Sequence, residues 1–476
     1  MIRSIAWKNV WRNKSRSLVV IIAVTLGTVA GVFVAGMLKG WVAQRVNDVI
    51  FTEQGHVKIQ NPDYLVNEEA SHYIANLADL EQYLKNSKDV VAYAKRSKIM
   101  AMASTARGSS GIMLKGIDSE SEKNVSAVYK HLLTGSGSYF EENSRLPLVV
   151  ISSKTAEQLR LKNYRITKLT TDTLAMLKVP QETVNKLTPI KEERFITRKK
   201  FESAIKGLWS DSEIRLYGPH LMNTAAYFQP NAKITFSFTK VNGQIGYLTC
   251  RVSGVFKTSN TLFDQTSAFV NHTDLVNATG LLPDQFHEVS VILSPTVKEI
   301  DPFIKNSSNQ FKNLSFLSWK VLAPDAGLMA DFIQVYYYLI MGIIFFALAF
   351  GIINTMLMAI LERVKELGML MAIGMKRNQV FNMIMLETIF LTLSGSLAGM
   401  VLGGLLIKVT EHTGLNFSSV AEGFESVGWA ATVYPDIDVS FFFGIILLVV
   451  IVAILSSIIP ARKALKLKPI EALRTE

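Results

Sequence analysis

The fold is decided by one stretch, Phe332–Leu361, which reads FIQVYYYLIMGIIFFALAFGIINTMLMAIL and contains no charged side chain over 30 residues. An α-helix needs about 20 apolar residues to cross the hydrocarbon core of a bilayer. At 1.5 Å per residue, a helix of this length measures about 45 Å, against a core of about 30 Å. We therefore predict a membrane helix whose N-terminal third rises out of the bilayer as a stalk.

Three further apolar blocks of sufficient length surround this stretch. Leu18–Leu38 and Val439–Ile459 carry no charge inside them, and Val380–Ile407 carries a single acid, Glu387. The predicted fold class is a membrane protein with four transmembrane α-helices, one plus three. A large α+β extracytoplasmic domain lies between helices 1 and 2.

The positions of Lys and Arg orient these helices. Residues 1–17 carry five of them and no acid, the segment 362–377 carries four, and the tail from Ala461 carries five. The positive-inside rule places all three in the cytoplasm of a bacterial inner membrane. The predicted segments are an amphipathic basic helix (1–17), helix 1 (18–40), the extracytoplasmic, periplasmic domain (41–331), helix 2 with its stalk (332–361), a cytoplasmic turn (362–379), helix 3 (380–407), an extracytoplasmic loop (408–438), helix 4 (439–459) and a cytoplasmic tail (460–476).

The same topology explains the charge of the chain. Of 476 residues, 49% are hydrophobic and only 19% are charged, and the net charge is +11. The three cytoplasmic pieces hold fourteen Lys and Arg against four acids, which accounts for +10 of that total. A nucleic-acid partner is therefore not expected, whereas membrane lipid is.

The extracytoplasmic domain alternates strand and helix patterns. Ile234–Phe238 and Tyr247–Phe256 read as two strands of a hairpin joined at Asn242-Gly243. Segment 163–231 has a charged centre at Lys191–Lys200 and is interpreted as an insertion of open function. We therefore predict an α+β module.

Polar and small residues mark special positions in the membrane helices. Burying the carboxylate of Glu387 is costly, so it should be protonated, paired or turned to the bundle interior, in a structural or a functional role. Glycines at four-residue spacing let helices approach closely. We predict tight helix packing at the two glycine stripes, which are Gly27 and Gly31 in the first block and Gly395, Gly399 and Gly403 in the third.

Residues 2–17 also have helical periodicity. Lys8, Arg12 and Arg16 fall on one stripe, with Ala6 and Val10 on the opposite side. This pattern favours a helix lying on the cytoplasmic membrane surface, although the same charges would arise from topology alone.

Motifs of catalysis are missing from the sequence. There is no G-x-x-x-x-G-K-[ST] loop for a nucleotide, no H-E-x-x-H and no G-x-S-x-G. The seven histidines lack metal-ligand spacing. We expect no catalytic residue, metal site or cofactor on this chain.

Three motifs resemble one family. Leu361–Met375 reads LERVKELGMLMAIGM, which is similar to the E-R-x-x-E-[IL]-G-x-L-x-A-[IL]-G turn of FtsX/MacB-type ABC transporter permeases. The ending PARKA at 460–464 followed by PIEALR at 469–474 resembles that of the family, and Ala6–Arg16 resembles its basic pre-membrane helix. Within the family, Gly55–Tyr64 and Ser318–Pro324 look most like the lipoprotein-releasing permeases of the LolC/LolE type.

The resemblance implies that the turn couples the chain to an ATPase. Leu367, Leu370 and Met371 would form an apolar edge with Glu362, Arg363 and Glu366 exposed, as in a helix that docks in a groove of a partner. Gly374 can end this helix. The residues implied in ATPase coupling are Glu362, Arg363, Glu366, Leu367, Gly368, Leu370, Met371 and Gly374.

The implied assembly is a dimer of permeases with separate cytoplasmic ABC ATPase subunits, which carry the ATP and Mg. The second permease would be identical or different, and a periplasmic carrier or an outer-membrane partner is a further expectation. Because the chain begins 17 residues before its first helix, the ATPase is expected on another polypeptide. The expected work is the release of lipoproteins from the inner membrane. Efflux of a drug or peptide and mechanical regulation of a cell-wall hydrolase are the alternatives.

Overall fold

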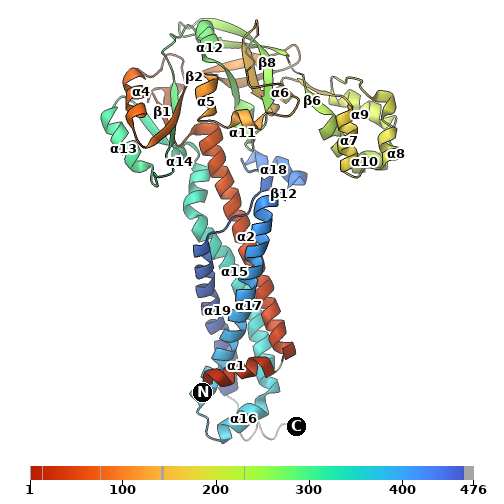
Figure 1. Cartoon of the computed structure of the whole chain (residues 1–476), viewed down its shortest axis with the longest axis vertical. Helices are drawn as coiled ribbons and strands as arrows, with labels where there is room; N and C mark the ends of the chain where they lie inside the picture. The colour runs from red at the N-terminus through yellow and green to blue at the C-terminus, as the bar shows by residue number, and fades with distance from the viewer. Residues whose placement is uncertain (1, 13, 76, 141–143, 230, 466–476) are drawn as a thin grey trace. The chain divides into compact units, whose positions relative to one another are not determined.

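The computed structural model describes residues 2–12, 14–75, 77–140, 144–229 and 231–465 (Figure 1). Its contacts separate the chain into two units, each of which is discontinuous in sequence. The membrane unit comprises 1–45, 328–421 and 430–476, and the sheet unit comprises 46–327 and 422–429. The predicted C-terminal motif at 469–474 lies outside the described residues.

The membrane unit is built from long helices. In the described ranges, four helices are long and apolar enough to cross a membrane, as predicted. They comprise α2 (Lys14–Asp48), α15 (Pro324–Glu362), α17 (Arg377–Thr413) and α19 (Val439–Leu465). Between α17 and α19 lie η4 (Ser418–Val420), α18 (Ala421–Ser426) and a two-stranded ladder of β12 (Leu415–Asn416) with β13 (Thr432–Val433). The helices exceed the predicted spans at most ends, because charged and polar residues continue a helix beyond the apolar core of a bilayer.

The N-terminal helix differs from the prediction. Helix α1 (Ile2–Arg12) ends at Arg12, and Arg16 already belongs to α2, so the three basic residues Lys8, Arg12 and Arg16 are not part of one helix. Ala6 and Val10 are fully buried with residues of α17, and the Ser17 hydroxyl donates a hydrogen bond to the Val10 carbonyl. Helix α1 therefore lies across the end of the helix bundle and packs on α17 (Figure 1).

The two glycine stripes face different neighbours. A Cβ atom built at Gly399 would lie 2.6 Å from the Cβ of Thr28, and one at Gly395 would lie 2.8 Å from the Ile21 carbonyl oxygen. The stripe of α17 therefore contacts α2, and Thr25 Oγ1 adds a 3.0 Å hydrogen bond to the Gly395 carbonyl. Gly403 faces Val32 of α2, whereas Gly27 and Gly31 face Leu348 and Met341 of α15.

The sheet unit is organised by one nine-stranded sheet in the order β11-β1-β10-β2-β3-β9-β4-β8-β7. The strands are β1 (Val57–Gln60), β2 (Val90–Ser104), β3 (Ser109–Ile117), β4 (Leu148–Ser152), β7 (Lys233–Thr239), β8 (Ile245–Phe256), β9 (Ser267–Asn271), β10 (Glu288–Leu293) and β11 (Ser315–Ser318). The hairpin predicted at 234–256 corresponds to β7 and β8, which pair antiparallel.

One end of this sheet is a ferredoxin-like module. In the antiparallel run β11-β1-β10-β2, α4 (Leu77–Asn86) connects β1 to β2, and α13 (Asp301–Gln310) connects β10 to β11. Leu80 and Leu84 of α4 and Phe303 of α13 cover the strands and bury Val57 and Val291. Two helices on one face of an antiparallel sheet thus form the first core of this unit.

The other end of the sheet closes on itself. The last residues of β2, Met102–Ser104, pair with Thr235–Ser237 of β7, so six strands from β2 to β7 form a barrel. Its interior is filled by alternate apolar side chains such as Leu114, Phe236 and Cys250. Closure removes the free edges that an open sheet would expose. Short helices pack against its strands, including α5 (Ser119–Lys123), α6 (Ser153–Gln158), α11 (Thr261–Thr266) and α12 (His272–Thr279).

The segment interpreted as an insertion has its own core. The paired strands β5 (Lys162–Tyr164) and β6 (Ala226–Phe228) bound four helices, α7 (Lys168–Met176), α8 (Gln181–Asn185), α9 (Arg198–Lys206) and α10 (Asp211–Ala225). Phe201 and Leu221 are fully buried in this core, and Trp209 Nε1 donates a 2.9 Å hydrogen bond to the Thr183 carbonyl. The four helices form a small subdomain on the barrel.

Candidate functional site: an ion network in the membrane unit

The turn between α15 and α17 contains a short helix held by two irregular residues. Helix α15 ends at Glu362, and Arg363 has non-helical dihedral angles of φ −108° and ψ 19°. Helix α16 (Val364–Ala372) follows, and Gly374 has φ +107°, a conformation that side-chain-bearing residues rarely adopt. Gly374 therefore sets the point at which the chain turns into α17.

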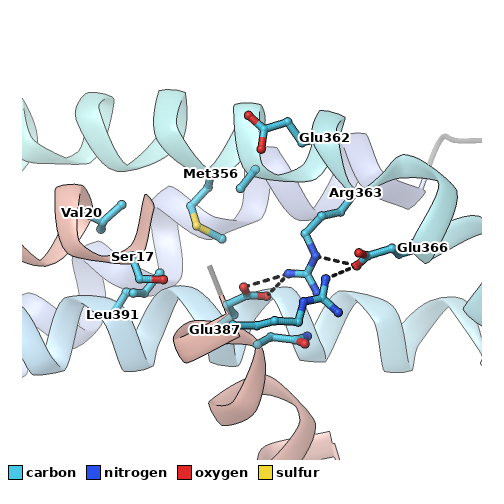
Figure 2. Close-up of a pocket in the computed structure, with 11 residues that line it drawn as sticks. Ser17, Val20, Met356, Glu362, Arg363, Glu366, Glu387 and Leu391 are labelled. Atoms are coloured by element: carbon cyan, nitrogen blue, oxygen red, sulfur yellow. Dashed lines mark hydrogen bonds and ion pairs between the residues drawn. The ribbon is translucent and has the colours of Figure 1, made fainter. Parts of the chain in front are cut away.

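Arg363 lies at the centre of an ion network (Figure 2). Its Nη1 lies 3.1 Å from Oε1 of Glu387 in α17, and its Nε lies 3.0 Å from Oε2 of Glu366 in α16. Glu366 also forms an ion pair with Arg12, the last residue of α1. Two cations and two carboxylates thus connect α1, the turn and α17.

The network is buried at one end and open at the other. The side chains of Glu387 and Arg363 are 11% and 16% exposed, whereas those of Glu366 and Arg12 are 43% and 54% exposed. A carboxylate within an apolar helix is tolerated when it is paired. Arg363 provides this pairing for Glu387 and also contacts Glu366, which is more exposed to water.

A cavity of about 270 Å³ adjoins these charges. Its walls come from α1, α2, α15, the turn and α17, and include Asn9, Ser17, Met356, Glu362 and Leu391 beside the network residues. Within the cavity wall, the hydrogen bond from Arg12 lowers the pKa of Glu366, as does the guanidinium of Arg363. Glu366 is therefore held as a carboxylate, which keeps both of its ion pairs.

The apolar edge expected in the turn is used inside the chain. Leu367 is 3% exposed and belongs to the same core as Val380 and Ile384 of α17, and Leu370 and Met371 pack partly against it. Arg363, expected to be exposed, is turned inward to Glu387. Both expectations are corrected for one reason. The helix faces its own bundle, which offers apolar surface and a counter-charge at short range.

The remaining turn residues present a different surface. Glu362 is exposed, and so are Lys365, Met369 and Ile373, whereas Gly368 lies on the buried side of α16. Sequence reasoning identified the charged residues of the turn but missed their partners. The spacing of Arg363 and Glu387, one on each side of a tight turn, is the signal that could have suggested the pair. Arg12 offered no such signal.

Among the residues that the structure describes, no group of three or more His, Cys, Asp or Glu side chains is arranged to hold a metal ion.

The architecture defines a class before any comparison is made, because four long apolar helices joined to a large α/β unit constitute a multi-pass membrane protein. Residues 338–469 match the FtsX-like permease C-terminal family. This part of the chain, which includes the turn and Glu387, is therefore an FtsX-like permease domain.

Similar proteins have been named as ABC transporter permeases. The chain is 31% identical over 179 residues to an uncharacterized ABC transporter permease, MJ1507, of Methanocaldococcus jannaschii, covering 38% of this chain and 42% of that protein. It is 35% identical over 127 residues to the macrolide export ATP-binding/permease protein MacB of Chlorobium luteolum, covering 26% and 16%. It is 24% identical over 259 residues to the uncharacterized ABC transporter permease YknZ of Bacillus subtilis, covering 52% and 60%. The chain thus spans between 16% and 60% of the length of these relatives.

Two solved structures align with part of the chain. The extracellular domain of the noncanonic ABC-type transporter YknZ aligns over 55% of this chain and 99% of its own, with 14% identity and a TM-score of 0.27. The periplasmic region of MacB from Actinobacillus actinomycetemcomitans aligns over 59% and 94%, with 11% identity and a TM-score of 0.29.

Proposed function

We propose that this chain is the permease subunit of an ABC transporter, and that ATP and Mg are bound by separate ATPase subunits in the cytoplasm. The observation that carries the proposal is the ion network centred on Arg363, which joins the turn of an FtsX-like permease domain to α1 and α17. The names of the similar permeases agree with this assignment.

In this proposal the turn divides its residues between two tasks. The exposed side of α16, with Lys365, Met369 and Ile373, contacts the ATPase. The opposite side, with Arg363 and Leu367, holds the turn to α17. Separating Arg363 from Glu387 would take a partly buried counter-charge away from a carboxylate in an apolar helix, which is costly. A displacement of α16 is therefore passed to α17 rather than absorbed in the turn.

The orientation of the chain follows from its charges. The basic residues of α1 and of the turn favour the cytoplasmic side of a bacterial inner membrane. The sheet unit then lies on the far side, where the mechanical work is done. A second permease completes the assembly as a dimer. In this chain the glycine stripe of α17 is occupied by α2, so the dimer contact uses another surface.

For the cargo, we propose lipoproteins or a related amphiphile, released from the outer leaflet of the inner membrane. This proposal rests on the sequence resemblance around Gly55–Tyr64 and Ser318–Pro324. Export of a macrolide-like drug is the second candidate, since the relatives called MacB are named for macrolide export. Depletion of the chain should strand lipoproteins in the inner membrane under the first proposal. Changed drug sensitivity with normal lipoprotein sorting would instead favour the second.

The coupling proposal is tested by purification and one charge reversal. Purification from native membranes should bring down an ABC ATPase as a separate polypeptide, and its absence would refute the assignment. Glu366→Lys should repel Arg12 and Arg363 and uncouple ATP hydrolysis from transport. The matched control is Glu411→Lys, at an exposed position near the other end of α17. Equal coupling in the two variants would remove Glu366 from the mechanism.

A further inference from the structure

Two lysines face each other across the longest strand pair of the sheet unit. Lys98 of β2 is registered directly opposite Lys115 of β3, and each residue is only 8% exposed. Like charges at directly opposed positions destabilise a strand pair, and burial strengthens their repulsion. An explanation is therefore needed for a pair of cations at this position.

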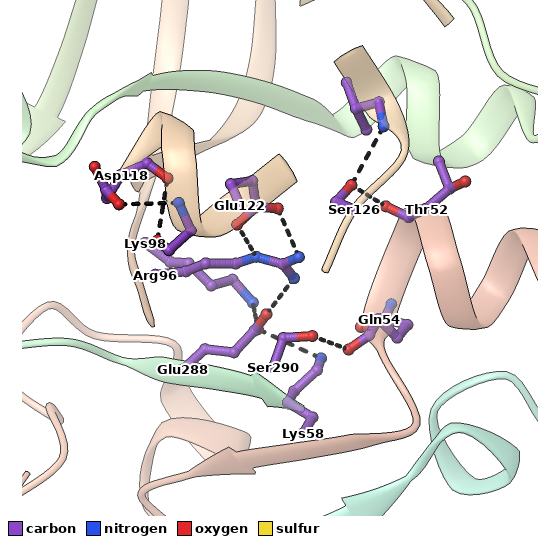
Figure 3. Close-up of polar contacts among 12 residues, drawn as sticks. Thr52, Gln54, Lys58, Arg96, Lys98, Asp118, Glu122, Ser126, Glu288 and Ser290 are labelled. Atoms are coloured by element: carbon purple, nitrogen blue, oxygen red, sulfur yellow. Dashed lines mark hydrogen bonds and ion pairs between the residues drawn. The ribbon is translucent and has the colours of Figure 1, made fainter. Parts of the chain in front are cut away.

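The carboxylates of this region are already engaged (Figure 3). Glu288 lies 3.0 Å from Lys98 Nζ, 2.8 Å from Arg96 Nη1 and 3.6 Å from Lys58 Nζ. Glu122 pairs with Arg96, at 2.7 Å. Together with Lys115, four buried cations share two carboxylates, so the cluster carries an excess of positive charge.

Among the described side chains, Lys115 has no carboxylate at ion-pair distance, and Glu288 acts on it only from farther away. In the described part of the chain, its Nζ has neither a hydrogen-bond nor an ion-pair partner. It lies 4.7 Å from the ring centroid of Phe263 and 5.4 Å from that of Phe269. Such contacts favour a cation but do not neutralise it. Burial, with the charges of Arg96 and Lys98, lowers the pKa of Lys115 to about 7. An anion beside Lys115 would reverse this effect.

A cavity of about 420 Å³ opens over the two lysines. This volume lies within the range of small-molecule sites. Its wall contains both charged and apolar residues. Lys98 and Lys115 lie beside Met100 and Leu262, which are 55% and 64% exposed. The lining also contains two carboxylates, Glu53 and Glu68; Glu53 accepts a 3.0 Å hydrogen bond from Asn260 Nδ2, and Glu68 is exposed at the rim.

We propose that this cavity binds an anionic amphiphile, with its head group between Lys115 and Lys98 and its apolar part on Met100 and Leu262. The amino group of Lys115, which has no ion-pair partner among the described residues and is protonated more readily beside an anion, specifies the charge of the head group. The exposed apolar side chains beside it specify the adjoining hydrocarbon, because a simple inorganic ion would leave them in water. The proposal concerns the sheet unit alone and does not depend on the coupling mechanism or on the cargo proposed above.

The test uses the full-length chain in amphipol, with lysines converted to ¹³C-dimethyl-lysine and observed by NMR. Lys115→Arg identifies the resonance of Lys115, and the exposed Lys233 serves as an internal reference. Three probes are titrated: hexyl phosphate, inorganic phosphate and hexan-1-ol. Hexyl phosphate should shift the Lys115 resonance saturably. Its half-saturation should be at least about tenfold below that of inorganic phosphate, since burying two methylenes contributes about that factor.

Variants locate the site. Lys115→Met should weaken the response of the Lys98 resonance to hexyl phosphate by at least about tenfold, whereas Lys115→Arg, which keeps the charge, and Lys233→Met should retain it. Three results would overturn the proposal. One is a Lys115 shift no larger than that of Lys233, another is equal half-saturation by inorganic phosphate, and the third is an equal response to hexan-1-ol.

Discussion

The two units of this protein each contain an ion network, and the networks differ in balance and in support. The network of the membrane unit has two cations and two carboxylates and draws on separate segments, α1, the turn and α17. The network of the sheet unit has four cations for two carboxylates and lies on neighbouring strands joined by a continuous ladder, with α5 beside them.

The two networks therefore differ in how easily their contacts can be exchanged. Arg12 and Glu366 are about half exposed, so water can replace their contact at little cost when segments move. Arg96, Glu122 and Glu288 are at most 2% exposed, and their ion-pair contacts join the strands and α5 out of reach of water. We infer that the first network suits transmission of movement, whereas the second holds a charge in one place.

The largest effect is expected at Glu288. Replacing it with Gln removes the shared counter-charge of Arg96, Lys98 and Lys58, and breaking a buried pair of this kind costs about 3–5 kcal/mol. The free energy of unfolding of the sheet unit should fall by that amount or the unit should not fold, as measured by denaturant titration. Glu120→Gln, in an exposed pair with Lys123, is the control. Equal stability of the two variants would contradict the distinction drawn between the networks.

The second effect concerns Arg363. Arg363→Met removes the guanidinium that lies 3.1 Å from Glu387 among apolar helices and should destabilise the membrane unit by about 2–4 kcal/mol. Adding Glu387→Gln should recover much of this loss, because the carboxylate that faced Arg363 is then replaced by a neutral amide. The apparent unfolding temperature of the chain in detergent measures both. A double variant no more stable than Arg363→Met would show that the pair is not the cause.

The third prediction tests the packing behind the membrane network. Gly399→Val places new atoms within 2.6 Å of Thr28 Cβ and 2.8 Å of the Thr25 carbonyl oxygen, so α17 and α2 must separate. Overpacking of this kind costs about 1–3 kcal/mol. Gly351→Val is the matched control, since nothing lies within 4 Å of a Cβ atom at that position. Unfolding temperatures that agree between the two variants would rule out close packing of α17 on α2.

The smallest effect is expected at the open end of the membrane network. Because Arg12 and Arg363 lower the pKa of Glu366, the carboxylate adds to the free energy of unfolding at every pH above the ordinary glutamate pKa. This stabilisation is lost as the pH falls through the lower pKa that Glu366 has in the folded chain. The pair with Arg12 is exposed and screened, so Glu366→Gln should cost less than about 1 kcal/mol near neutral pH. Unfolding temperatures at neutral and acidic pH, in low and high salt, should converge for wild type and variant in acid and in 1 M salt. A difference in unfolding temperature between wild type and variant that persists in acid would show that the effect does not come from charge.

Much of the fold followed from the sequence because its strongest signals are local. The four apolar blocks predicted the membrane helices, and Gly374 predicted the end of α16. Strands β2 and β3 were not predicted, since Lys95, Arg96, Lys98 and Lys115 interrupt the apolar alternation on which strand prediction rests. Arg96 and Lys98 are tolerated because Glu122 and Glu288 reach them, and Lys95 pairs with Glu81; these partners lie in other elements of the chain.

The candidate site was predicted in part for the same reason. Its residues in the turn are contiguous and could be recognised together. Their contacts with Arg12 and Glu387 depend on how α1 and α17 pack, which no local pattern encodes. The turn was therefore assigned an exposed Arg363 and a free apolar edge, whereas the folded chain turns Arg363 and Leu367 inward.

The most direct test of the account is a double-mutant cycle on Arg363 and Glu387 in the complete transporter. ATP hydrolysis and its stimulation by cargo would be measured for Arg363→Gln, Glu387→Gln and the double variant in lipid nanodiscs, each corrected for the amount of folded complex. The account predicts that each single variant loses most of the stimulation and that the double variant loses no more than either. Stimulation that is unchanged in both single variants, or losses that multiply in the double variant, would contradict transmission through this ion pair.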